Sequence, residues 1–251
     1  MIRIERLRKT YGPIVAVDDL TLEVASGTVL GFLGRNGAGK TTTIRMMVGL
    51  LEPTAGTVVL DGHDIRRTPE AAKAVTGYLP DRPHLYDKLT GREYLAFVAG
   101  LYGLSRREAR QRAVALLDDL DLTPQGDELV ETYSHGMKQR LALCGALIHD
   151  PRILVLDEPM VGLDPQGAHE LRRLLRQLAA AGVTIFLSTH SLAVAEDVSS
   201  CIAILDRGRL VALGTLEELR ARARDASGNG AGGSESASLE DVFMDILGAR
   251  P

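Results

Sequence analysis

The sequence predicts an α/β fold with a parallel-sheet core, an N-terminal antiparallel β subdomain and a helical insertion subdomain. Stretches of mainly apolar residues at 29–33, 153–156 and 183–188 are expected of strands buried on both faces, as in a parallel sheet. Apolar and charged residues alternate over 1–7 and 20–24, which indicates half-exposed antiparallel strands. Helical patterns between the buried strands complete the α/β alternation.

The first buried strand leads into a glycine-rich turn and an expected helix over Thr41–Leu51. A strand over Thr57–Leu60 follows. The Asp61-Gly62 pair after it is a hairpin signal, because both residue types tolerate the positive φ of a tight hairpin turn.

Residues 85–150 are helical in character and form the predicted insertion, because apolar residues recur there at helical spacing. Ser105 and Glu108 match a capping box at the start of one helix. Ser134 has the residue type that caps helix N-termini, and it precedes a third helical pattern. The expected helices are Glu93–Gly103, Ser105–Leu120 and Met137–Ile148.

Strand and helix alternate again after the insertion. Asp164 and Pro165 are favoured at the first positions of a helix, and Gly182 is favoured just past its end. The expected elements after the strand at 153–156 are the helix Pro165–Ala181, the strand Val183–Ser188, the helix Leu192–Val198 and the strands Ile202–Asp206 and Arg209–Val211.

Composition changes near the end of the chain. Ala226–Ser238 is rich in Gly and Ser and is predicted to be a linker. Apolar residues then recur at helical spacing over Leu239–Leu247. The sequence therefore predicts a main domain over 1–220 with its helical subdomain at about 85–150, a linker over 221–238, and an amphipathic helix within 239–251.

Bulk properties exclude several function classes. The chain has 251 residues, 45% of them hydrophobic, and a net charge of −4, so no strong basic field points to nucleic acid and no nucleic-acid partner is expected. Cys144 and Cys201 lie far apart in apolar surroundings, which favours two core residues over a disulfide or a metal site. No apolar run reaches the roughly 18–20 residues of a membrane helix. If this protein serves a membrane, another chain must cross it.

The strongest motif fits G-x-x-x-x-G-K-[ST] and lies between a buried strand and a helix. Glycines let successive backbone N–H groups surround phosphate oxygens, and the helix N-terminus adds positive potential. Lys40 is expected to reach the β- and γ-phosphates, and the Thr41 hydroxyl is expected to bind Mg²⁺. A plain glycine-rich turn would not need this lysine. The candidate nucleotide-binding residues of this loop are Gly34, Arg35, Asn36, Gly37, Ala38, Gly39, Lys40, Thr41 and Thr42.

The apolar strand at 153–156 ends in two carboxylates, Asp157 and Glu158. Asp157 is expected to hold Mg²⁺, and Glu158 to orient or deprotonate the attacking water. A strand followed by an acidic turn is common on its own. Together with the phosphate loop it predicts a P-loop NTPase that hydrolyses its nucleotide.

Residues 132–140, Thr-Tyr-Ser-His-Gly-Met-Lys-Gln-Arg, precede the acidic strand and resemble the signature sequence of the ATP-binding-cassette (ABC) family. This resemblance covers nearly all of residues 1–220 and implies a RecA-like P-loop NTPase core. It also implies a dimer in which Ser134 and the Gly136 backbone contact the γ-phosphate bound by the partner's phosphate loop. A Ser N-cap alone would be the plain structural alternative. The position of this motif between insertion and acidic strand favours the family match.

Three further residues match the family in order along the chain. Tyr11 corresponds to the aromatic residue that stacks on adenine, with a surface tyrosine at a strand end as the alternative. Gly162-Leu163-Asp164 resembles the D-loop, through which protomers sense each other's sites, and Asp164 is also a helix N-cap. His190 follows a buried strand and resembles the switch histidine, which implies a hydrogen bond to the γ-phosphate and a role in holding the attacking water.

The sequence departs from the family pattern at two places. Asp81 stands where the family usually carries the Q-loop glutamine, and we expect it to contribute to the Mg²⁺ site. A solvent-facing loop acid is the alternative. His135 and Met137 replace the more frequent glycine and glutamine of the signature. Similar variants, and C-terminal sequences like Ser238–Phe243, occur in exporter subfamilies. His135 would make binding pH-sensitive if it faced phosphate.

The resemblance implies an ATPase that uses ATP and Mg²⁺ and closes as a homodimer or heterodimer around two nucleotides. It further implies a separate transmembrane permease of the ABC-2 type, an export function, and a cytoplasmic location on the inner face of the cell membrane through that permease. The helical insertion and the Asp81 loop are the expected docking surface.

The sequence argues against three alternative functions. A soluble, non-transport ABC ATPase acting on a macromolecular complex would usually carry long coiled coils or two cassettes, and this sequence has neither pattern. A P-loop kinase or GTPase would lack the signature, and a GTPase would carry Asn-Lys-x-Asp. A regulatory module that binds ATP without turnover would need neither Glu158 nor His190.

Overall fold

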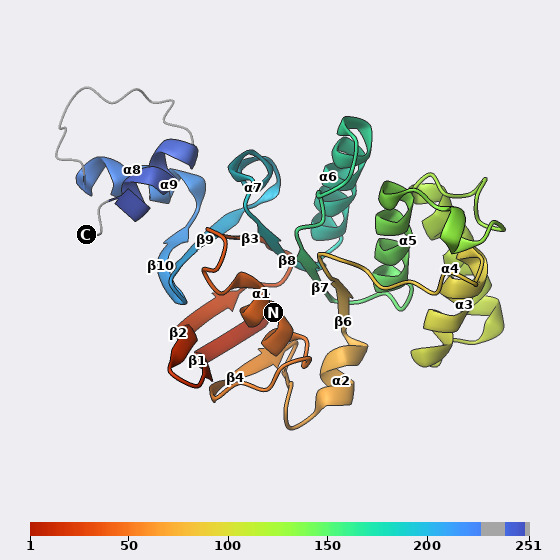
Figure 1. Ribbon diagram of the computed structural model, residues 1–251, viewed down its shortest axis with the longest axis horizontal. Helices are drawn as coiled ribbons and strands as arrows, with labels where there is room; N and C mark the ends of the chain where they lie inside the picture. The colour runs from red at the N-terminus through yellow and green to blue at the C-terminus, as the bar shows by residue number, and fades with distance from the viewer. Residues whose placement is uncertain (227–238, 249–251) are drawn as a thin grey trace.

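The computed structural model describes residues 1–226 and 239–248. Its core is a six-stranded sheet in the order β10-β9-β3-β8-β7-β6 (Figure 1). Neighbouring strands are parallel except for the antiparallel edge strand β10. This arrangement confirms the predicted parallel core. The strands are β3 (Val29–Gly34), β6 (Thr76–Leu79), β7 (Ile153–Asp157), β8 (Thr184–Thr189), β9 (Cys201–Asp206) and β10 (Arg209–Gly214).

A second, four-stranded antiparallel sheet has the order β2-β1-β4-β5. Asp61 and Gly62 both have positive φ in the turn that joins its last two strands, as the hairpin signal predicted. Helix α1 (Lys40–Met47) contributes Ile44 and Met47 to one apolar cluster with residues of both sheets, so it is buried against both. The strands are β1 (Ile2–Tyr11), β2 (Ile14–Val24), β4 (Ala55–Leu60) and β5 (His63–Asp64).

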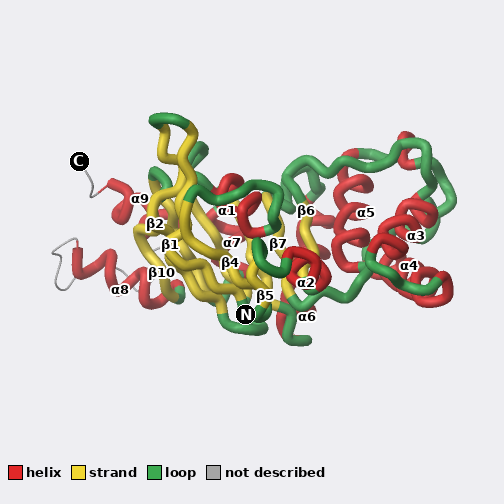
Figure 2. Tube along the Cα trace, turned by 90° about the horizontal axis from the view of Figure 1, so that it is seen from below, coloured by secondary structure: helices red, strands yellow, loops and turns green. Residues whose placement is uncertain are grey.

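The helical insertion lies at one end of the molecule, beside strand β6 (Figures 1 and 2). The capping box of Ser105 and Glu108 is present, and Ser134 caps the following helix by accepting a hydrogen bond from the Met137 N–H at 3.3 Å. A second capping box, between Thr90 and Glu93, was not predicted. The helices are α3 (Gly91–Leu101), α4 (Arg106–Asp119) and α5 (His135–Leu147), with a short 3₁₀ turn at Val130–Thr132.

Helices α6 (Pro165–Ala180) and α7 (Leu192–Val198) follow strands of the core sheet, close to the predicted bounds. Two helices were not predicted: α2 (Pro69–Ala74) and α8 (Leu216–Ala226). The second corrects the predicted linker, because residues 221–226 continue a helix that begins at Leu216. The rest of that linker, 227–238, lies outside the described residues.

The C-terminal helix α9 (Leu239–Gly248) packs on this chain's own core. Leu239, Val242 and Leu247 are buried in one cluster with Leu33 of β3 and Ala195 of α7. Its apolar face is therefore used inside the molecule. Within the described ranges, no helix has both the length and the apolarity needed to span a bilayer.

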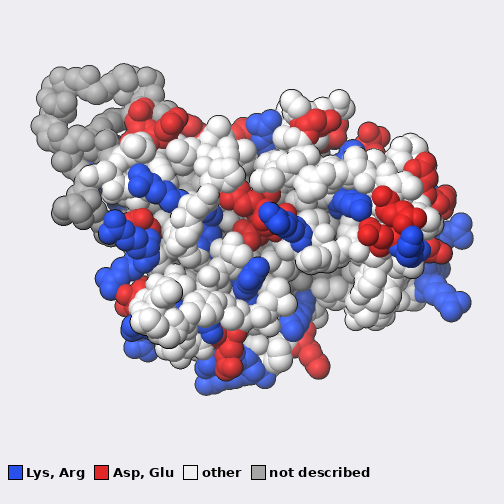
Figure 3. All heavy atoms as spheres, in the orientation of Figure 1, with Lys and Arg blue, Asp and Glu red and all other residues white. Residues whose placement is uncertain are grey.

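The carboxyl ends of the central strands lie together at one edge of the core sheet. Asp157 pairs with Ser188, and Leu33 pairs with Thr189, so the ends of β3, β7 and β8 lie at one edge of the sheet. Ligands bind at this edge in open α/β sheets, because loops from several strands converge there. On the face drawn in Figure 3, acidic and basic side chains are interspersed, in keeping with the net charge of −4.

Candidate nucleotide-binding site

A cavity of about 390 Å³ lies at this edge of the core sheet. It brings together the phosphate loop, the acidic end of β7 and the residue that follows β8. Most of the site residues predicted from the sequence are in its wall. The lining residues are Ala16, Arg35, Asn36, Gly37, Gly39, Lys40, Thr41, Thr42, Asp81, Asp157, Glu158, Val161 and His190.

The phosphate loop has a backbone that its glycines make possible. Gly37 and Gly39 have φ values of 80° and 105°, a region that side chains disfavour. A Cβ atom at Gly39 would lie 2.5 Å from the carbonyl oxygen of Ala16, and one at Gly34 would lie 2.6 Å from the carbonyl oxygen of Leu205. The loop is therefore held closely between β2 and β9, and small residues are needed at both positions.

Lys40 is buried at the base of the loop, with 8% of its surface exposed. Its Nζ donates to the carbonyl oxygens of Gly34 at 2.7 Å and Arg35 at 3.4 Å. Burial lowers the pKa of Lys40, and the nearby carboxylates of Glu158 and Asp157 oppose this effect. An ammonium group held this way is directed at the loop interior, where phosphate oxygens would accept its hydrogen bonds.

Asp157 is almost completely buried, at 1% exposure, and none of the described residues donates a hydrogen bond to its Oδ1. Burial raises the pKa of Asp157; the hydroxyl groups of Ser188 and Thr41 oppose this effect, and the charges of Asp81 and Glu158 reinforce it. A buried carboxylate oxygen without a partner is costly unless a cation or donor pairs with it. Its surroundings therefore fit a divalent cation.

The oxygen ligands around Asp157 suit Mg²⁺, which needs only a few ligands from the protein. Thr41, Asp81 and Asp157 line the same cavity, whereas the described residues contain no group of three or more His, Cys, Asp or Glu side chains placed to hold a metal ion by themselves. Mg²⁺ usually keeps several waters and binds through one or two protein oxygens plus substrate phosphates. This donor set fits such a site and does not form a complete metal cage.

Glu158 and His190 form a pair across the cavity. Nδ1 of His190 lies 2.9 Å from Oε2 of Glu158, within ion-pair distance when the imidazole is protonated. Glu158 has φ 51°, and its N–H donates to the carbonyl oxygen of Ser188 at 3.0 Å. The unusual backbone places the carboxylate directly after β7, and the ring of His190 is largely exposed toward the opening.

The signature residues lie outside this cavity. Ser134 and Gly136 start helix α5, and a Cβ atom at Gly136 would lie 3.5 Å from the carbonyl oxygen of Gly162. The ring of His135 packs against Gly162 as well, because a Cβ atom there would lie 2.0 Å from its Cδ2. Asp164 accepts a hydrogen bond from the Gly167 N–H at 2.7 Å. The signature and the 162–164 loop thus adjoin each other, and Ser134, Gly162 and Asp164 are exposed.

Tyr11 is also outside the cavity wall. Its ring is 48% exposed at the end of β1, with the Lys9 ammonium 5.3 Å from the ring centre. Two wall residues, Ala16 and Val161, were missed by sequence reasoning, because small apolar side chains carry no chemical signal. The sequence did not predict that the turn after β9 supports the phosphate loop: the Gly208 N–H donates to the Ala38 carbonyl, and the Gly208 carbonyl accepts from the Asp18 N–H.

The family model of the ABC transporter matches residues 17–161, more than half of the chain. This chain belongs to the ABC transporter family. The matched segment contains the phosphate loop, the signature and the Asp157–Glu158 pair. Tyr11, Asp164 and His190 lie outside it.

Similar curated ABC proteins include ATP-binding proteins named for resistance and export. The daunorubicin resistance ATP-binding protein DrrA3 of Streptomyces coeruleorubidus is 42% identical over 220 residues, which cover 88% of this chain and 70% of that protein. The Nod factor export ATP-binding protein I of Paraburkholderia xenovorans (strain LB400) is 40% identical over 213 residues, 85% of this chain and 70% of that protein.

Solved structures agree with the ABC assignment. The structure of an ATP-binding subunit of an ABC transporter superimposes with a TM-score of 0.88 at 34% identity and covers 98% of this chain and 99% of its own. A dimeric, post-hydrolysis ATP-binding cassette bound to ADP and Pi gives a TM-score of 0.79 at 26% identity, covering 86% and 99%. The predicted P-loop NTPase fold is therefore confirmed.

Proposed function

We propose that this chain is the ATP-hydrolysing subunit of an ABC transporter and that it works as one half of a dimer enclosing two ATP molecules. The main support is that one cavity combines phosphate-binding and hydrolytic residues. Lys40 and the phosphate loop adjoin the Glu158–His190 pair, whereas Ser134 and Gly136 lie outside. One chain thus supplies the phosphate loop and the hydrolytic residues of a site, and the signature residues of a second chain complete it.

ATP binding uses the loop and its lysine. The loop N–H groups and Lys40 bind the β- and γ-phosphates, and the N-terminus of α1 adds positive potential. Thr41, Asp157 and Asp81 would hold Mg²⁺, which neutralises phosphate charge when it is bound. Tyr11 is proposed to stack on the adenine.

Glu158 acts as the general base. A water oxygen attacks the γ-phosphorus, its proton passes to the Glu158 carboxylate, and the bond to the bridging oxygen of ADP breaks. The Nδ1–H of His190 holds the carboxylate in position. Inorganic phosphate and ADP are the products.

Dimer closure supplies the missing side of each site. The N-terminus of α5, with Ser134 and Gly136, is proposed to meet the γ-phosphate bound by the other chain, because a helix start with a hydroxyl group and a glycine is an anion site. ATP then favours the closed dimer because it binds the closed state more tightly than the open state. Hydrolysis removes the γ-phosphate bridge, and the halves separate.

The membrane partner is proposed to be an ABC-2-type permease, and the direction export. Relatives named for drug resistance and Nod factor export support this. The docking surface is proposed at the insertion and the Asp81 loop, where Phe97 and Tyr102 are exposed whereas Tyr94 packs on the core. Asp81, Arg82 and neighbouring residues line a cavity of about 660 Å³ there. The permease would place this chain on the cytoplasmic face of the membrane.

The test is an affinity purification of the tagged chain from detergent-solubilised native membranes, with mass spectrometry of its partners. A stoichiometric multi-spanning protein is expected. Recovery only with ribosomal or DNA-associated proteins would favour the alternative of a non-transport ABC ATPase and would overturn the transport proposal.

A further inference from the structure

Two of the proposed site segments are directly attached to helices. The 162–164 loop ends at Asp164, the N-cap of α6, and His190 lies next to Ser191, the N-cap of α7. Any displacement of one helix along the other therefore changes the distance between the 162–164 loop and His190.

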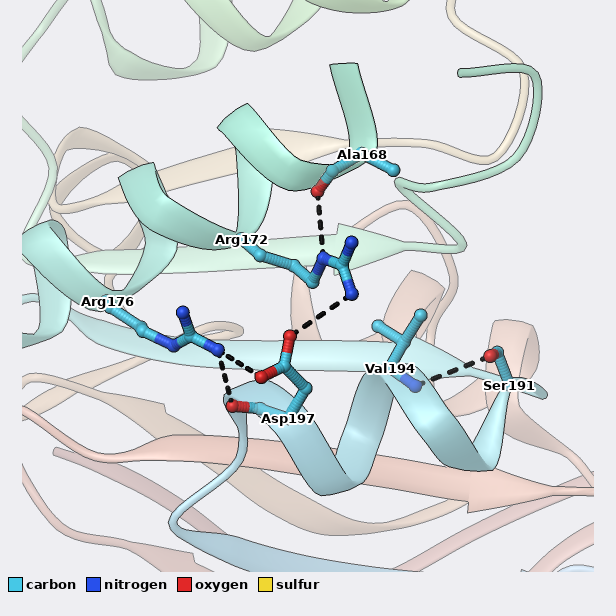
Figure 4. A network of polar contacts seen from close by, with 6 residues as sticks. All are labelled: Ala168, Arg172, Arg176, Ser191, Val194 and Asp197. Atoms are coloured by element: carbon cyan, nitrogen blue, oxygen red, sulfur yellow. Dashed lines mark hydrogen bonds and ion pairs between the residues drawn. The ribbon is translucent and has the colours of Figure 1, made fainter. Parts of the chain in front are cut away.

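A single carboxylate near the C-terminal end of α7, that of Asp197, joins this helix to the middle and the C-terminal half of α6 (Figure 4). Arg172 Nη1 donates to Asp197 Oδ2 at 3.2 Å, and Arg176 Nη2 donates to Asp197 Oδ1. Arg172 is itself oriented by a hydrogen bond from Nε to the carbonyl oxygen of Ala168 at 3.1 Å. Each oxygen of one α7 side chain is thus bound by a different arginine of α6.

Arg176 also satisfies the end of the short helix. Its Nη2 donates to the main-chain carbonyl oxygen of Asp197 at 3.0 Å, one of the carbonyls that a helix C-terminus leaves without a partner. A cation at this position also interacts favourably with the helix dipole.

Helix α7 has seven residues and would not be stable alone. Ser191 caps its start by accepting a hydrogen bond from the Val194 N–H at 3.4 Å. Its own residues Ala195 and Val198 are buried. The apolar contacts hold α7 against the sheet. The two arginines fix its position relative to α6.

We infer that Asp197 is a positioning residue for hydrolysis: with Arg172 and Arg176 it couples the 162–164 loop to His190 within one chain. A second copy that displaces the loop moves α6, and the coupled α7 then shifts His190 relative to Glu158, which His190 already contacts at 2.9 Å in the single chain. This inference rests on the proposed function, because it assumes that His190 and the dimer interface act in hydrolysis.

The test compares Asp197→Asn with Glu196→Gln in the full chain. Glu196 is the adjacent residue, has a similar exposure of 34% against 37%, and pairs with Arg220 of α8 at 2.8 Å, so its variant breaks a comparable ion pair that does not reach α6. We expect Asp197→Asn to lower kcat for ATP about five- to tenfold with KM within about twofold. Glu196→Gln should change kcat by less than about twofold.

A double-mutant cycle separates coupling from general destabilisation. Arg172→Gln combined with Arg176→Gln should lower kcat as much as Asp197→Asn does, and adding Asp197→Asn should lower it little further, because one linkage has already been lost. The arginine variants also serve if Asp197→Asn fails to fold. Three results would overturn the inference. They are a wild-type kcat in Asp197→Asn, an equal loss of kcat in Glu196→Gln, and losses of kcat that add when Asp197→Asn is combined with the two arginine variants.

Dimerisation distinguishes this inference from the proposed function. In a Glu158→Gln background, ATP should still form dimers whether or not Asp197→Asn is present, because the coupling acts on His190 and not on nucleotide binding. Failure of Glu158→Gln alone to dimerise would overturn the proposed function. Loss of the dimer only after Asp197→Asn would overturn the positioning role.

Discussion

Replacing Asp157 with asparagine should stabilise the nucleotide-free protein while nearly abolishing its ATPase activity. The carboxyl group is buried, and its Oδ1 has no donor among the described residues. Its raised pKa means that ionisation costs stability in the folded state. This cost is absent below the ordinary Asp pKa of about 3.9 and grows as the pH rises above it.

The size of the effect follows from this buried oxygen. An unsatisfied buried polar group costs about 1–3 kcal/mol. Asparagine removes the charge but keeps a polar group in the same place, so we expect a net gain of about 1 kcal/mol, or a rise in Tm of about 2–4 °C for a chain of this size. Activity should fall by about 100-fold, because a proposed Mg²⁺ ligand is lost.

Thermal unfolding in EDTA at pH 7.5, with a parallel ATPase assay in Mg²⁺, measures both effects. Glu128→Gln removes an exposed carboxylate and should change Tm by less than about 2 °C. The stabilisation of Asp157→Asn should shrink as the pH falls toward 4. A variant that melts below the wild type in EDTA would show that the Asp157 carboxylate does not destabilise the fold, and one that retains its ATPase rate would show that Asp157 is not a Mg²⁺ ligand.

Three further substitutions test separate parts of the site. Gly39→Ala should weaken ATP binding in a nucleotide titration. The φ of 105° and the 2.5 Å between the new Cβ atom and the Ala16 carbonyl oxygen would impose strain of about 1–3 kcal/mol. Wild-type affinity would count against the loop geometry. Asp81→Ala should raise the Mg²⁺ concentration for half-maximal hydrolysis about tenfold; an unchanged value would make Asp81 a plain loop acid. Gly162→Ala should displace the ring of His135 and reduce ATP-driven dimerisation in sedimentation experiments, and unaltered dimerisation would exclude that contact from the interface.

Features set by neighbouring residues could be predicted from the sequence. The bounds of α7 at Leu192–Val198, the Ser105 capping box and the Ser134 N-cap all depend on side chains within a few positions of one another. The strained loop of Gly37 and Gly39 is similarly local, so its place between a buried strand and a helix was predicted correctly.

Features set by distant residues could not be predicted in the same way. The order of strands in the core sheet depends on pairing between segments far apart in the chain, such as Leu79 with Leu156 and Val29 with Ile185. Helix α8 was not predicted, and the predicted linker began at 221, although the Gly/Ser-rich composition begins only at the last residue of this helix, Ala226. The carbonyl of Ala16, which limits the space at Gly39, comes from a separate sheet.

The central claim is that one chain hydrolyses ATP only in a site completed by another. The most direct measurement is sedimentation velocity of Glu158→Gln with and without ATP and Mg²⁺. Removing the general base should lower hydrolysis about 10²–10⁴-fold and so preserve the bound ATP. The account predicts a dimer in ATP that is lost when Ser134→Ala is added. A Glu158→Gln protein that remains monomeric in saturating ATP would contradict it.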